Sequence, residues 1–163
     1  MAPDAPDVRT LEVRGWLLRA SEDLRAGRHD LTAMPPLVND VVFHAQQCVE
    51  KAMKAYLVHR EQTFRKTHNL TELGGAVARL EPAWTDLMKH ASLLTEFAWR
   101  FRYPGEPATV SRQDAEQAIL MEFEIKDDST DQYFVVISEN PEPMAIAIAM
   151  HSLGWSGKYQ VIS

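Results

Sequence analysis

The chain has 163 residues and a mass of 18.5 kDa, which leaves room for one ordinary domain with an appendage, and its apolar fraction of 45% is enough for a buried core. The net charge of −6 is unevenly spread, because residues 1–119 carry 15 Lys/Arg and 16 Asp/Glu whereas residues 120–163 carry 2 and 7. This balance argues against a protein that coats nucleic acid indiscriminately, and no apolar run approaches the roughly 20 residues that span a bilayer.

The first seven residues are rich in Ala, Pro and Asp and have neither the basic nor the apolar segment of a secretory signal. A single cysteine, Cys48, excludes an internal disulfide and a multi-cysteine zinc site. Both features predict a protein of the reducing cytoplasm that has no membrane partner.

Five helices are predicted in chain order. Residues 8–25 place apolar side chains at three- and four-residue steps, and Gly27 suits the left-handed position that ends a helix. The second helix, residues 37–60, follows two prolines and carries an apolar stripe broad enough to be mostly buried. The remaining three are expected at residues 70–80 behind a capping box of Asn69 and Glu72, at 81–101, and at 111–121.

Short connections between these helices predict a mainly α fold, an antiparallel up-and-down bundle of four to five helices over residues 8–121. Residues 122–163 differ in composition. Two β-type segments, 123–125 and 133–137, flank a polar connection and predict a short C-terminal β-hairpin appendage, while 144–150 fits either a third strand or a helical turn. So small a unit should lean on the bundle or on another chain.

The polar edge of the second helix is the main functional candidate. His44, Gln47, Lys51 and Lys54 are spaced by three, four and three residues, so on a helix they form one ridge. If water reaches this ridge, its imidazole, amide and two ammonium groups can hold a phosphate and a base edge. The alternative is an ordinary solvated face with an intrahelical Glu50–Lys54 pair, and the spacing alone favours that alternative.

Two further polar clusters could contribute to binding. Arg65-Lys66-Thr67-His68 precedes the third helix, and Arg100-Phe101-Arg102-Tyr103-Pro104 closes the fourth. Cations at a helix C-terminus complement its dipole, but an arginine beside a tyrosine could instead pair with phosphate while the ring stacks on a base. Since no His-x-x-x-His or Glu-x-x-His pair occurs, no metal is expected, and no cofactor motif is present.

Four stretches follow one another in a characteristic order: residues 16–24, FHAQQCVEKAMKA at 43–55, KTHNLTEL at 66–73, and Arg102-Tyr103-Pro104. In this combination they resemble the HEPN family (higher eukaryotes and prokaryotes nucleotide-binding domain) over about residues 8–120. The resemblance implies an α-helical bundle that commonly forms a homodimer and associates with nucleotides or RNA. It also implies a nucleotidyltransferase partner protein in a toxin–antitoxin-like system.

Carried over by position, the resemblance assigns nucleotide or phosphate contacts to the polar residues of these motifs. They are His44, Gln47, Lys51, Lys54, His68, Arg102 and Tyr103. The leading hypothesis is a non-catalytic dimeric binding module. One alternative is a metal-independent endoribonuclease toxin with His44 or His68 as general base, although the Arg-x4–6-His spacing of ribonuclease members is missing and no catalytic residue is assigned. The other is a dimerisation scaffold whose β tail joins a partner's sheet.

The tail itself resembles another family more distantly. Residues 122–138 are similar to the opening hairpin of YegP-like repeats, but Asn140-Pro141 stands where that family has Asn-Gly. No function is inferred from this similarity.

Overall fold

A computed structural model of the chain describes the backbone of residues 7–100, 110–120, 124–128, 132–139 and 144–151, and the side chains of residues 7–96 and 110–119. The described part is mainly helical, which confirms the mainly α character predicted from the sequence. Its helices are α1 (Val8–Thr32), α2 (Val38–His59), α3 (Leu70–Leu80), the 3-10 turn η1 (Pro82–Trp84), α4 (Thr85–Arg100) and α5 (Arg112–Leu120). Among the described residues, no helix combines the length and apolar character needed to cross a bilayer.

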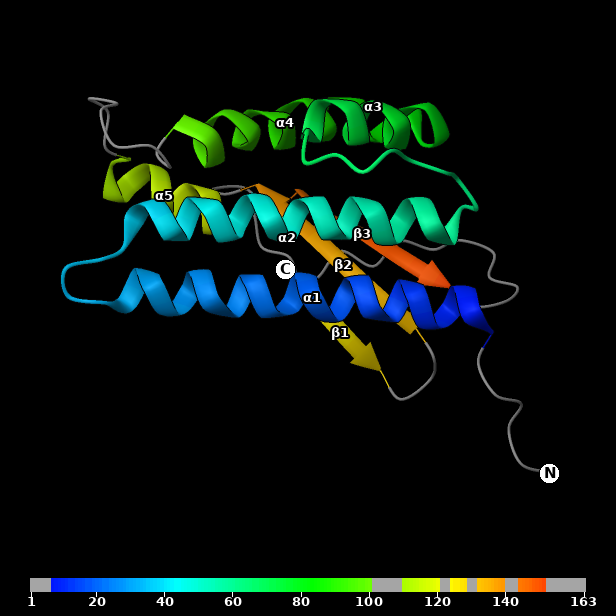
Figure 1. The fold of residues 1–163 in the computed structure, drawn as a ribbon, viewed down its shortest axis with the longest axis horizontal. Coiled ribbons are helices and arrows are strands. Elements are labelled where there is room, and N and C mark those ends of the chain that lie inside the picture. The colour runs from blue at the N-terminus through cyan, green and yellow to red at the C-terminus, as the bar shows by residue number, and fades with distance from the viewer. Residues whose placement is uncertain (1–6, 101–109, 121–123, 129–131, 140–143, 152–163) are drawn as a thin grey trace.

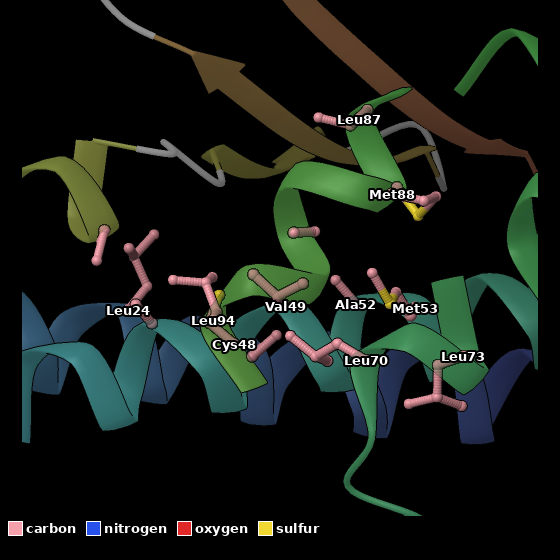
Figure 2. Packing of buried hydrophobic residues seen from close by; sticks show 14 of the residues in the cluster. Leu24, Cys48, Val49, Ala52, Met53, Leu70, Leu73, Leu87, Met88 and Leu94 are labelled. Carbon is pink, nitrogen blue, oxygen red and sulfur yellow. The ribbon is translucent and has the colours of Figure 1, made fainter. Parts of the chain in front are cut away.

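The helices are arranged around α2, which packs against all the others. Figure 1 shows α1 and α2 side by side, with α3 and α4 on the other side of α2 and α5 near the end where α1 connects to α2. Figure 2 shows how α2 side chains meet those of neighbouring helices in the core. The labelled core residues are Leu24, Cys48, Val49, Ala52, Met53, Leu70, Leu73, Leu87, Met88 and Leu94, all buried.

The first helix is longer than its sequence predicts. It continues through Gly27 to Thr32. Gly27 is a close-packing position rather than a cap, because a Cβ atom there would lie 3.2 Å from the Cβ of His44 and 2.8 Å from the Cδ1 of Ile119. The missing side chain therefore lets α2 and α5 approach α1, and the prediction that the helix ends at Gly27 was wrong.

The start of α3 agrees with the predicted cap in part. The Asn69 side chain accepts hydrogen bonds from the backbone N–H groups of Thr71 (2.8 Å) and Glu72 (3.3 Å). The return bond of a capping box is replaced, since the Asn69 N–H donates to Thr67 Oγ1 (3.1 Å) and the Glu72 carboxylate lies 3.3 Å from Arg65. This arrangement fixes the segment between α2 and α3, which carries His68.

Beyond α5 the backbone runs through β1 (Glu124–Asp128), β2 (Gln132–Glu139) and β3 (Met144–His151), in the antiparallel order β1-β2-β3. The side chains of these strands lie outside the described residues. That these strands form an appendage separate from the bundle, and that the chain divides at residue 121, therefore stay predictions.

Candidate functional site

The polar residues of α2 fall into two clusters, of which the first faces α1. His44 Nδ1 lies 3.0 Å from Asp23 Oδ1, and its Nε2 lies 3.7 Å from Asp30 Oδ2. Lys51 forms an ion pair with the other oxygen of Asp23. All four side chains are at most 26% exposed, so this Asp23 cluster (Asp23, Asp30, His44 and Lys51) places one ammonium and one imidazole against two carboxylates inside a helix–helix contact.

The second cluster surrounds the carboxylate of Glu50, which is buried. Lys54 Nζ donates to Glu50 Oε1 at 2.7 Å, and His68 Nδ1 lies 3.0 and 3.1 Å from the two carboxylate oxygens. The side-chain amides of Gln46 and Gln47 donate to Oε2 at 3.2 and 3.3 Å. Each of these contacts offers hydrogen-bond donors to a buried charge, which is the condition for keeping it inside a fold.

Gln47 connects the two clusters. Lys51 Nζ donates to Gln47 Oε1 (3.3 Å), while Gln47 Nε2 donates to Gln46 Oε1 (2.7 Å) as well as to Glu50. Gln46 Nε2 also donates to the backbone carbonyl of His68 (3.1 Å). One continuous hydrogen-bond network therefore runs from α1 across α2 to the segment before α3.

The predicted ridge is thus not a single water-accessible edge. The side chains of His44, Lys51 and Lys54 are only 26%, 19% and 7% exposed. The reason is that the Lys51 amine pairs with Asp23 of α1 and the Lys54 amine pairs with Glu50 on the buried side of α2. Both amines are therefore directed into helix contacts. The intrahelical Glu50–Lys54 pair of the alternative is present at 2.7 Å, but it is buried and does not lie on a solvated face.

A cavity of about 710 Å³ opens beside the Glu50 cluster (Gln46, Gln47, Glu50, Lys54 and His68). It lies between the first half of α1, the end of α2 and residues 61–68, and both Lys54 and His68 reach it. The residues that line it are Arg9, Glu12, Trp16, Lys54, Val58, Glu61, Gln62, Thr63, Phe64, Lys66, Thr67 and His68. The cavity therefore joins a predicted helix-two residue to the predicted Thr-His motif.

Two aromatic rings form part of this cavity. Trp16 and Phe64 meet edge to face with ring centroids 6.5 Å apart, and the Lys54 ammonium lies 5.2 Å from the centroid of a Trp16 ring. Both aromatic residues are half-buried. Their contribution was missed at the level of sequence, where Trp16 counts as part of an apolar helix stripe and Phe64 lies in a loop without a motif.

Charged groups of both signs line the same cavity. Arg9, in the first turn of α1, forms an ion pair with Glu61, just after α2. Lys66 is exposed and has no ion-pair partner among the residues that the structure describes. The cavity therefore combines aromatic surface and an exposed imidazole with both cations and carboxylates.

The comparison with protein families gives one match: the model described as the HEPN domain covers residues 13–125. The chain belongs to the HEPN family. No curated protein and no solved structure matches it. The matched segment of this HEPN chain contains α1 from Val13 onward and the whole of α2 to α5. It therefore includes both polar clusters and the cavity lining except Arg9 and Glu12.

Three predicted site residues of the HEPN chain, His44, Arg102 and Tyr103, are not placed at the cavity by the described structure. Arg102 and Tyr103 lie outside the described residues. Cys48 is fully buried, and burial raises the pKa of its thiol, as expected for an inert packing residue. Within the described ranges no group of three His, Cys, Asp or Glu side chains is placed to hold a metal ion. Both ring nitrogens of His44 face carboxylates of α1, and His44 does not line the cavity.

Proposed function

We propose that this HEPN chain is a nucleotide- or RNA-binding module and that the cavity beside the Glu50 cluster is its binding site. The observation that supports this proposal is a convergence of two residues 14 positions apart in the sequence. Lys54 and His68, both assigned to binding by their motifs, contact the same buried carboxylate and line the same cavity. Family membership supports a nucleotide- or RNA-related role in general terms.

The composition of the cavity supports a ligand of this class. A volume of about 710 Å³ lies within the roughly 300–1,000 Å³ usual for small-molecule sites. Stacking of a base on an aromatic side chain contributes on the order of 1–3 kcal/mol, and Trp16 and Phe64 offer such surfaces. Lys66 and His68 would then supply positive charge and hydrogen-bond donors to a phosphate.

The remaining predicted residues take an indirect part in this proposal. His44, Gln47 and Lys51 hold α1 and the Glu50 cluster in position through the hydrogen-bond network, rather than touching the ligand. Arg102 and Tyr103 stay candidates for a second contact with phosphate and base. We also propose that the module acts as a homodimer with a nucleotidyltransferase partner in a toxin–antitoxin-like system, in keeping with its family.

Calorimetric titration of the full chain with ATP, GTP and a short single-stranded RNA tests the proposal. We expect binding by at least one ligand, and a decrease in affinity of about fivefold in Lys66→Ala, because a charge-assisted contact to phosphate is worth roughly 1 kcal/mol or more. The matched control is Lys89→Ala, an exposed lysine of α4 that pairs with Asp86 away from the cavity, and it should bind like the parent. Absence of heat with all three ligands would contradict the proposal.

A further inference from the structure

The ion pair between Arg9 and Glu61 joins two parts of the cavity wall that are far apart in the sequence. Arg9 lies in the first turn of α1 and Glu61 follows the end of α2, 52 positions later. Both side chains line the cavity and are partly exposed, 43% for Arg9 and 72% for Glu61. Exposed ion pairs of this kind are weak because water screens both charges, so another anion can readily replace one partner.

The backbone of Glu61 marks the position as unusual. Its φ of 56° lies in the left-handed region, which glycine adopts far more easily than a residue with a Cβ. The N–H of Gln62 donates to the Leu57 carbonyl (2.8 Å) and the N–H of Glu61 donates to the Val58 carbonyl (3.0 Å), so Glu61 occupies the glycine position of a Schellman motif. A carboxylate is held here at a local conformational cost, and its partner is Arg9.

The position of Arg9 on α1 matches what a phosphate-bearing ligand needs. Arg9, Glu12 and Trp16 follow one another at three- and four-residue steps, so all three share the face of α1 that lines the cavity. A guanidinium can bind phosphate through two parallel hydrogen bonds, as it can bind a carboxylate. A phosphate can therefore take the place of Glu61 on Arg9. Glu12, between the two, offers an acceptor for a ribose hydroxyl or a base amino group.

We propose that Arg9 is the phosphate-binding residue of this cavity and that Glu61 competes with the ligand for it. The ligand class is a nucleoside phosphate whose base lies against Trp16 and Phe64 while its phosphate takes Arg9 from Glu61, with Lys66 as a second cation. The inference rests on the proposed function, and it adds a named phosphate contact and a built-in competitor. Glu61 thereby lowers the affinity of the site for ligands that carry phosphate and leaves its affinity for a bare nucleoside unchanged.

Calorimetry on the full chain with ATP and with adenosine, which has the base and ribose but no phosphate, tests the inference. We expect Glu61→Gln to bind ATP about threefold to fivefold more tightly than the parent, since it removes a competing surface charge, and to bind adenosine with unchanged affinity. Arg9→Gln should weaken ATP binding about tenfold. The matched control Glu22→Gln removes an exposed α1 carboxylate that pairs with Arg19 outside the cavity, and it should leave both affinities unchanged.

The outcomes separate the inference from the proposed function. If the parent binds ATP but Glu61→Gln binds it no more tightly, or if the variant gains equally for adenosine, the competition by Glu61 is refuted while the binding function stands. If neither the parent nor any variant binds either compound, the inference fails, and the proposed function fails with it only when GTP and the RNA give no heat either. Unfolding curves of each variant confirm that the compared proteins are folded.

Discussion

At the scale of single residues, two glycines of α1 illustrate how one residue type can meet opposite demands. Gly27 is buried against α2 and α5, where a Cβ would crowd His44 and Ile119. Gly15 lies on the outer face of the same helix, and a Cβ there would meet no heavy atom within 4 Å. Gly27 therefore serves packing, whereas the structure gives Gly15 no comparable role.

The same substitution should accordingly have opposite effects at these two positions. Gly15→Ala should raise the free energy of unfolding by about 1 kcal/mol, because alanine has the higher helix propensity in an exposed helix interior. Gly27→Ala should lower it by about 1–3 kcal/mol, because the added methyl overpacks the contact with the His44 Cβ. Urea unfolding followed by circular dichroism measures both, and a stabilised Gly27→Ala would show that α1 and α2 separate more easily than their packing indicates.

At the scale of elements, α2 contains a charge in its buried face. Glu50 is 2% exposed and is neutralised by Lys54 one turn later on the same helix. The segment before α3 is held to Glu50, because the His68 and Gln46 side chains both contact its carboxylate. The Gln46 side chain also donates to the His68 backbone carbonyl. The Glu50 cluster is therefore a joint between α2 and the loop that borders the cavity.

Removing only the Lys54 charge should lower the free energy of unfolding more than removing the charges of both Glu50 and Lys54. Lys54→Met leaves Glu50 with the His68 and glutamine donors only, and we expect a loss of about 3 kcal/mol in unfolding free energy. The double variant Glu50→Gln/Lys54→Met should recover part of this loss, since no uncompensated charge stays buried. Chemical denaturation of both variants gives the comparison. A double variant less stable than Lys54→Met would show that the carboxylate matters more for its hydrogen bonds than for its charge.

The helices were predictable because their signal is local. Apolar side chains at three- and four-residue steps placed α2 and α3 within a residue or two, and Asn69 marked the start of α3. The end of α1 was missed because the role of Gly27 depends on its contacts with α2 and α5. The residues next to Gly27 in the sequence give no sign of these contacts. A glycine looks the same in sequence whether it ends a helix or admits a neighbour.

The site was only partly predictable for the same reason. His68 and Lys54 carry motif signals, and the structure brings them together at Glu50. Of the two carboxylates that divide the predicted ridge, Glu50 lies on α2 itself, but Asp23 lies 28 positions before Lys51 and on another helix. The aromatic pair and the Arg9–Glu61 contact likewise link distant segments, so only the tertiary structure reveals the cavity.

At the scale of the whole molecule, the described hydrophobic core lies between Val13 and Ile119, within the helical bundle. We therefore expect a chain that ends at residue 121 to unfold cooperatively, with a midpoint in urea close to that of the full chain. Far-ultraviolet circular dichroism during titration makes the measurement. A truncated chain that unfolds gradually would show instead that residues 122–163 complete the core, and would argue against two separate units.

The fully buried Cys48 thiol has a practical consequence for the study of motions in this bundle. It is the single thiol of the chain and lies at the centre of α2, so a sulfhydryl reagent can reach it only when the surrounding helices part. The rate at which Cys48 is alkylated in the native protein thus measures how often the helices open, without any engineered label. Slower alkylation in the presence of a nucleotide would show that the nucleotide binds and makes the opening of the helices less frequent.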